Sequence, residues 1–102
     1  FKGAFFDAKC NFIGSETVAK GSLSFAYVSP AELFRKALLK NAVMIVILHN
    51  HPSGDPTPSR EDLELTQQIA RGAQLLGITL ADHIVIGDNR YYSFRENHRL
   101  ET

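Results

Sequence analysis

Residues 42–62, AVMIVILHNHPSGDPTPSRED, decide the fold of this chain. The stretch opens with seven consecutive apolar residues, 42–48, which are rich in β-branched side chains and predict a central strand covered on both faces. That strand ends in His49 and His51, a loop with three prolines follows, and residues 59–62 read Ser-x-x-Asp, a typical helix start. The stretch therefore predicts a buried strand and a helix joined by a stiffened loop, with polar side chains at the junction.

The segment before this stretch contains strand patterns followed by one helix. Residues 1–21 predict two strands with a turn near residues 7–11, and residues 22–29 could add a short third strand. Residues 29–41 contain the start and stop signals of a helix, with a serine cap, a proline at the first helical position and an asparagine at the end. This half of the chain is expected to supply an antiparallel pair and one covering helix.

The segment after the stretch predicts a long helix and two more strands. The helix should run from Ser59 to about Leu76, where Gly77 ends it. Residues 78–88 and 90–97 predict two strands joined by a turn. The order of elements is typical of an α/β (α+β) fold in which a mixed β-sheet is flanked by helices.

Length and composition predict one domain over residues 1–102, which is long enough to form a single core. The 11 basic and 11 acidic residues balance, which speaks against DNA binding by phosphate neutralisation. No apolar run approaches the roughly eighteen residues of a membrane span, so no membrane partner is expected. The chain opens on Phe1 within an apparent strand, and we expect an excised domain that lacks its natural N-terminal part.

The single cysteine, Cys10, cannot form an internal disulfide, and one cysteine builds neither a zinc finger nor a redox pair. A reducing, cytoplasmic location fits this cysteine usage. We expect Cys10 to be a buried or half-buried filler, because the sequence indicates no histidine positioned to activate it as a nucleophile.

The two histidines at the end of the central strand predict a metal site. His49 and His51 are separated by one residue, so in extended backbone both side chains point the same way. Catalytic zinc usually takes three protein ligands and keeps a fourth position for water. Asp62 is the candidate third ligand, because it lies three residues before Leu65 and therefore on the inner face of its helix. Asp55 in the loop is a rival ligand.

A metal-bound water also needs a proton acceptor, and the acids upstream are Asp7, Glu16 and Glu32. Glu32 is explained by its capping box and Asp7 by a turn. Glu16 shares a strand face with Phe12 and Val18, so an acid stands where core residues are expected. A glutamate in a strand is more often exposed at an edge than catalytic, and the residues alone leave the identity of the base open.

The set formed by Glu16, His49-x-His51 followed by proline, and Ser59-x-x-Asp62 resembles the complete motif of the JAMM (JAB/MPN) metalloprotease superfamily. The sequence around this motif, HNHPSGDPTPSREDLELT and LADHIVIGDNRYYSFRE, resembles more narrowly the bacterial RadC family, whose members are named as DNA repair proteins. The resemblance covers nearly the whole chain. HNHPSG is a sequence motif that is highly specific for that family.

The resemblance implies an MPN/JAB-like sheet with an architecture related to cytidine deaminases. It implies zinc (Zn2+) held by His49, His51 and Asp62. Glu16 would bind the metal water and act as general base and then as acid, and Ser59 would help to stabilise the oxyanion of the tetrahedral intermediate. RadC proteins carry an N-terminal helix-hairpin-helix region that this chain lacks, so a link to DNA would be indirect.

These observations lead to two hypotheses from different classes. The first is a zinc-dependent hydrolase, a metalloprotease of JAMM type that acts on a peptide or isopeptide bond of an unknown protein. The alternative is a non-hydrolytic interaction module in DNA repair or recombination, with a structural or vestigial metal site. A metal-dependent nuclease would favour hard oxygen ligands over a histidine pair. His83 is expected to be a core histidine, or to orient a ligand from behind.

Overall fold

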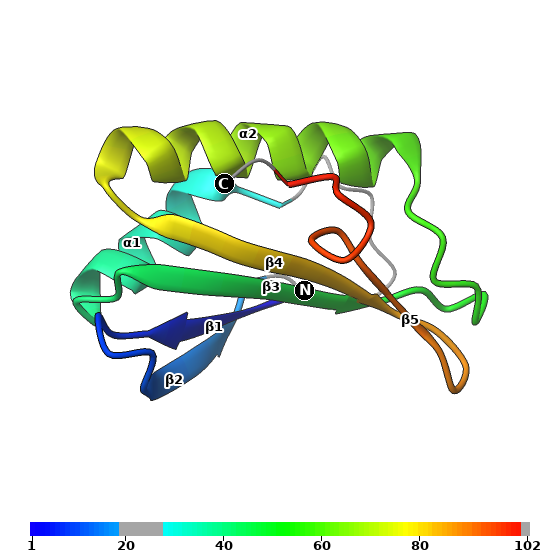
Figure 1. The fold of residues 1–102 in the computed structure, drawn as a ribbon, viewed down its shortest axis with the longest axis horizontal. Coiled ribbons are helices and arrows are strands. Elements are labelled where there is room, and N and C mark those ends of the chain that lie inside the picture. The colour runs from blue at the N-terminus through cyan, green and yellow to red at the C-terminus, as the bar shows by residue number, and fades with distance from the viewer. Residues whose placement is uncertain (19–27, 101–102) are drawn as a thin grey trace.

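The computed structural model describes residues 1–18 and 28–100 (Figure 1). Its elements are β1 (Lys2–Phe6), β2 (Phe12–Thr17), α1 (Pro30–Leu39), β3 (Met44–Asn50), α2 (Arg60–Leu76), β4 (Thr79–Ile86) and β5 (Tyr91–Ser93). The order agrees with the sequence prediction. The short strand expected at residues 22–29 falls almost entirely outside the described residues.

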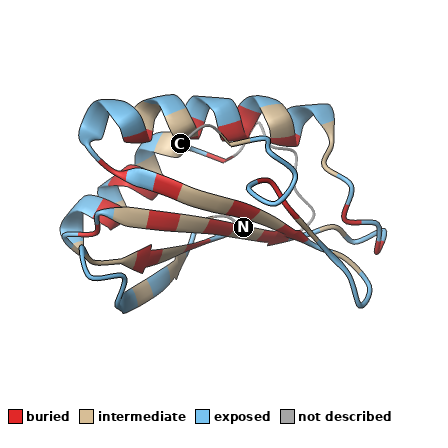
Figure 2. Cartoon of the chain, viewed as in Figure 1, coloured by how far each residue is buried: buried red, intermediate tan, exposed pale blue. Residues whose placement is uncertain are grey.

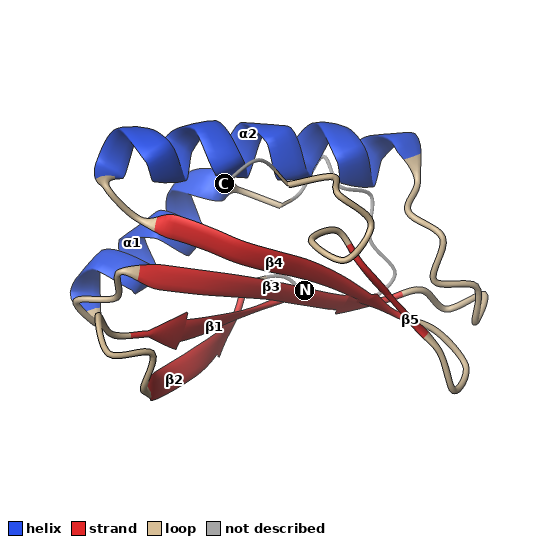
Figure 3. Ribbon diagram, viewed as in Figure 1, coloured by secondary structure: helices blue, strands red, loops and turns tan. Residues whose placement is uncertain are grey.

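The five strands form one mixed sheet in the order β2-β1-β3-β4-β5 (Figure 3). β3 and β4 are parallel neighbours, and the other three pairs are antiparallel. Because α2 connects two parallel strands, it must run back across the sheet from the end of β3 to the start of β4. Its first turn therefore lies at the end of the sheet where β3 stops. The predicted mixed sheet with flanking helices is confirmed, and the topology places the start of α2 beside the end of β3.

Both helices cover the same face of the sheet. Gly72 of α2 lies so close to α1 that an added Cβ would stand 2.7 Å from the ring of Phe34. The core between the helices and the sheet includes Phe5, Leu33, Ala37, Ile45, Ile47, Leu65, Ile69 and Ala73.

Alternate residues of β3 are buried and the intervening ones are half-buried (Figure 2). The prediction that β3 is fully covered on both faces is therefore wrong, because the helices shield only one face. Within the described parts of the chain, no helix is both long and apolar enough to cross a bilayer.

The turn between β1 and β2 overturns the prediction for Cys10. Its backbone φ is +63°, and the residue is exposed. The turn is held by Asp7, whose Oδ1 accepts hydrogen bonds from the backbone N–H groups of Lys9 and Asn11, both at 2.9 Å. This local bonding closes the turn without burying any side chain, which leaves the thiol in solvent.

Candidate metal centre

His49, His51 and Asp62 come together where β3 ends and α2 begins. One ligand atom from each residue lies within 4.8 Å of the others. His49 Nε2 is 3.2 Å from Asp62 Oδ1, and His51 Nε2 is 3.1 Å from Asp62 Oδ2. Asp62 and His49 are buried and His51 is half-buried. The group therefore has one protected side and one side open towards solvent.

The backbone just after β3 keeps both histidines on the helix-covered side. The N–H of His51 donates to the carbonyl of Ile86 at 3.0 Å, so the pairing with β4 continues one residue past the end of β3. The loop then turns at Gly54, whose φ is +84°, and is tied to the turn between β4 and β5 by a 2.8 Å hydrogen bond from the N–H of Asp88. The loop between β3 and α2 is thus hydrogen-bonded to β4 at its start and to the β4–β5 turn at Gly54.

Asp55, the rival ligand, takes part through its backbone and not through its carboxylate. Its carbonyl accepts a hydrogen bond from His51 Nδ1 at 2.9 Å. Its Oδ1 accepts the backbone N–H of Thr57 at 3.0 Å and the hydroxyl of Thr57 at 2.7 Å. These bonds from Thr57 lower the pKa of the Asp55 carboxyl. The backbone carbonyl of Asp55 therefore orients His51, while the Asp55 carboxylate bonds Thr57 within the loop.

Behind His49 a chain of hydrogen bonds leads back to α2. His49 Nδ1 is 2.9 Å from His83 Nε2, and His83 Nδ1 is 2.5 Å from Thr66 Oγ1. Thr66 Oγ1 donates to the carbonyl of Asp62 at 2.6 Å. The His83 ring is fully buried and stacks on Phe94, with ring centroids 4.6 Å apart and planes inclined by 8°. His83 thus contacts a candidate ligand from behind.

Sequence reasoning named His83 but missed Thr66. A signal for Thr66 was present, because a residue four positions after Asp62 lies on the same face of a helix. What the sequence lacked was a reason to connect that hydroxyl with a histidine on β4.

Two of the buried groups have strongly shifted pKa values. Burial would raise the pKa of the Asp62 carboxyl, but contact with His49 and hydrogen bonds from Ser59 outweigh it and lower the pKa from 3.8 to about 2. Burial, reinforced by charge on the neighbouring His49, lowers the pKa of His83 from 6.5 to about 3. At neutral pH the centre thus contains an anionic carboxylate and a neutral His83.

The lowered pKa of His83 makes the stability of the metal-free protein depend on pH. Between pH 6.5 and about 3 the unfolded chain protonates this residue and the folded chain does not, so its stabilising effect is complete above pH 6.5 and is lost as pH falls. From pH 7 to pH 5 this linkage removes about 2 kcal/mol from the free energy of unfolding. Urea unfolding of the wild type and of His83→Gln at both pH values measures it. The wild type should lose about 2 kcal/mol more than the variant, and equal losses would contradict the assignment.

The donor set fits a metal ion of the zinc type. Two imidazole nitrogens and one carboxylate make up a typical catalytic zinc site, and bonds of about 2.0–2.1 Å at tetrahedral angles place neighbouring donor atoms about 3.3 Å apart. The two Nε2 atoms lie 3.2 Å and 3.1 Å from different oxygens of Asp62, and one ligand atom from each residue lies within 4.8 Å of the others, so the three side chains are near enough to share one ion. Asp62 Oδ1 is also buried without a hydrogen-bond partner among the described residues. The group could hold a metal ion.

Ser59 contacts the group through Asp62. It caps α2, and its Oγ accepts the N–H of Asp62 at 3.1 Å. In return, Asp62 Oδ2 accepts the backbone N–H of Ser59 at 2.6 Å. This capping box orients the carboxylate, so the predicted double use of Asp62 as cap and inward-facing acid is geometrically possible.

Glu16 lies on the correct face of the sheet but outside the group. Its ladder partner is Gly3, which is paired in turn with Ile47, two residues before His49. Paired residues project to the same face, and two strand spacings place the Cα of Glu16 on the order of 10 Å from β3. The side chain is half-exposed, and its Oε1 is 3.6 Å from Lys36 Nζ on α1.

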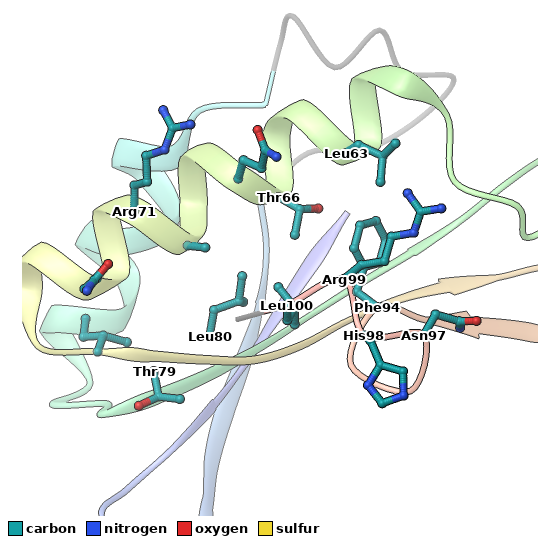
Figure 4. Close-up of a pocket in the computed structure, with 14 residues that line it drawn as sticks. Leu63, Thr66, Arg71, Thr79, Leu80, Phe94, Asn97, His98, Arg99 and Leu100 are labelled. Atoms are coloured by element: carbon teal, nitrogen blue, oxygen red, sulfur yellow. The ribbon is translucent and has the colours of Figure 1, made fainter. Parts of the chain in front are cut away.

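A separate cavity of about 800 Å³ lies between α2 and the C-terminal segment (Figure 4). Thr66 and Phe94 line it, and both also contact His83. None of the three grouped residues belongs to its lining. The cavity and the candidate metal centre therefore share the surroundings of His83 but are different places.

Comparison with known proteins identifies the family. A family model described as RadC-like JAB domain matches residues 1–100. A UPF0758 protein of Desulfitobacterium hafniense is 45% identical over 96 residues, which cover 94% of this chain and 42% of that protein. Another, from Clostridium beijerinckii, is 50% identical over 84 residues, which cover 82% of this chain and 37% of that protein. The chain thus spans less than half the length of these relatives, and over that span it belongs to the family of RadC-like JAB domains.

Proposed function

We propose that this chain is a zinc-dependent hydrolase domain, a metalloprotease of JAMM type that cleaves a peptide or isopeptide bond in a protein substrate. The observation that carries the proposal is the pair of imidazole Nε2 atoms held 3.2 Å and 3.1 Å from the two oxygens of a buried carboxylate. Zinc in such a site polarises a substrate carbonyl and lowers the pKa of a bound water to about 7. Membership of a JAB-domain family supports the same chemistry.

The ligands in this proposal are His49, His51 and Asp62, and the open side of His51 is where substrate would approach. Ser59 would stabilise an oxyanion by turning its hydroxyl hydrogen from the Asp62 carboxylate, whose pKa it helps to lower, to the substrate, while its oxygen keeps accepting the N–H of Asp62.

Glu16 would take the proton of the attacking water and pass it to the leaving amine. In the structure its carboxylate faces Lys36. Catalysis therefore requires Glu16 to exchange this half-exposed ion pair for the water. Such surface pairs contribute only about 0–1 kcal/mol, so the exchange costs little.

A second candidate function follows from the same position of Glu16. If its role is only the ion pair with Lys36, the domain is a non-hydrolytic interaction module with a structural or vestigial metal site, acting in DNA repair or recombination. Any link to DNA would then run through the additional length of the longer relatives. In both versions the domain works in a reducing, cytoplasmic setting, where an exposed thiol such as Cys10 persists.

The test combines metal content with hydrolysis. Protein purified or refolded with zinc should contain one zinc per chain by elemental analysis. It should cleave members of a library of peptides and lysine-linked isopeptides, lose this activity with a chelator and regain it with zinc. Protein without stoichiometric zinc rejects the hydrolase and leaves only the interaction module with a vestigial metal site. Zinc-loaded protein that cleaves no member and produces no new termini in a cell extract rejects the hydrolase and favours the module.

A further inference from the structure

We infer that Thr66 and His83 form a proton-ordered hydrogen-bond chain that fixes His49 in the tautomer whose Nε2 can bind a metal. Neither residue belongs to the group of three ligands, so both are positioning residues. The inference deepens the proposed function and rests on it for the presence of a metal. The ordering of the protons, however, is a property of the metal-free protein.

The direction of the chain is set at Thr66. A backbone carbonyl can only accept, so the hydroxyl hydrogen of Thr66 must point to the carbonyl of Asp62, 2.6 Å away. Only lone pairs of Thr66 Oγ1 then remain for His83 Nδ1. His83 Nδ1 must therefore carry a hydrogen and donate it.

The same logic passes through His83 to His49. A neutral imidazole has one N–H, and that of His83 is used on Thr66, so His83 Nε2 is an acceptor. His49 Nδ1, 2.9 Å away, must donate to it. Neutral His49 consequently has its lone pair on Nε2, and because this atom faces the anionic Asp62 Oδ1 at 3.2 Å, a metal ion or a second proton on His49 must lie between the two atoms. The row of hydrogen bonds thus begins at the backbone carbonyl of Asp62 and ends beside the carboxylate of the same residue.

Packing prevents the His83 ring from turning over and exchanging its nitrogens. The ring is fully buried, lies nearly parallel to Phe94 at 4.6 Å, and meets the edge of Phe1 at 6.2 Å. The two ligands thus reach the same tautomer by different means. His51 Nδ1 donates directly to the carbonyl of Asp55, whereas His49 Nδ1 donates to His83 Nε2.

A matched pair of variants at Thr66 tests the chain. Thr66→Val keeps the shape but removes the acceptor, so the His83 proton is expected to move to Nε2, where it drives the His49 proton from Nδ1 to Nε2. Thr66→Ser keeps the hydroxyl. Zinc affinity, measured by competition with a chelating dye, should fall about 10–100-fold in Thr66→Val, the range for losing an outer partner of a ligand, and return towards the wild-type value in Thr66→Ser.

Side-chain 15N NMR of the metal-free protein supplies the readout that a merely structural role would not move. At a pH where the rings are neutral, His49 should carry its proton on Nδ1 in the wild type and Thr66→Ser, and on Nε2 in Thr66→Val. His83→Gln offers a second route, because its amide oxygen can accept from His49 and its amide nitrogen can donate to Thr66. It should keep near-wild-type affinity while His83→Leu loses it.

The outcomes separate this inference from the proposed function. A wild-type protein that binds no zinc rejects the function, yet its NMR spectrum still decides the tautomer. A wild-type His49 that carries a proton on Nε2 and none on Nδ1 overturns the inference whatever the zinc content. So does a folded Thr66→Val that keeps the Nδ1 proton on His49 and matches the zinc affinity of Thr66→Ser.

Discussion

Asp62→Asn is expected to remove stoichiometric zinc binding while the chain still folds. Asparagine is nearly the same size, is also a good helix-capping residue, and can accept the N–H of Ser59 through its amide oxygen. It lacks the negative charge that the two Nε2 atoms of His49 and His51 face at 3.2 Å and 3.1 Å. We expect zinc affinity to fall by more than about 100-fold, beyond the 10–100-fold cost of losing an outer partner.

Thermal unfolding with and without zinc measures this effect independently of any substrate. Zinc at about 1,000 times its dissociation constant stabilises the wild-type fold by about 4 kcal/mol, and Asp62→Asn should show almost none of that gain. Asp55→Asn is the matched control, because the carboxylate of Asp55 is exposed and its partners among the described residues are Thr57 and Arg90. It should behave as the wild type. An Asp62→Asn protein with one tightly bound zinc would remove Asp62 from the ligand set.

The three grouped residues could be predicted because short-range rules place them. His49 and His51 share a side through the two-residue period of a strand, and Asp62 faces inward through the periodicity of its helix. The only non-local step was that the start of the helix returns to the end of the strand, which a short proline-rich loop enforces. Period, capping and loop length are all readable from one sequence.

The remaining features depend on strand order and register, which no local pattern contains. His83 lies 34 residues from His49 and reaches it because β3 and β4 are parallel neighbours with Ile47 opposite His83. The same row continues through Gly3 to Glu16, so the candidate base shares a face with the candidate ligands. Its ion pair with Lys36 depends on how α1 lies across the sheet.

Glu16→Gln is expected to keep zinc and lose hydrolysis. Glutamine preserves the size of the side chain but cannot accept a proton at neutral pH, and general acid–base catalysis contributes about 100- to 10,000-fold to a rate. Because Glu16 lies outside the ligand group, zinc affinity should stay within about threefold of the wild type. The drop should therefore appear in kcat, measured on a substrate found in the library, while zinc content is unchanged.

Lys36→Gln is the matched control for this last prediction. It removes the partner that holds Glu16 at 3.6 Å but leaves the carboxylate, so the base is released without being neutralised. If Glu16 is the base, Lys36→Gln keeps or raises kcat while Glu16→Gln lowers it by at least about 100-fold. If another group is the base and Glu16 only pairs with Lys36, both variants lose a little stability and neither changes kcat. Loss of zinc in Glu16→Gln would be a third result, and it would make Glu16 a ligand that reaches the centre only when zinc is bound.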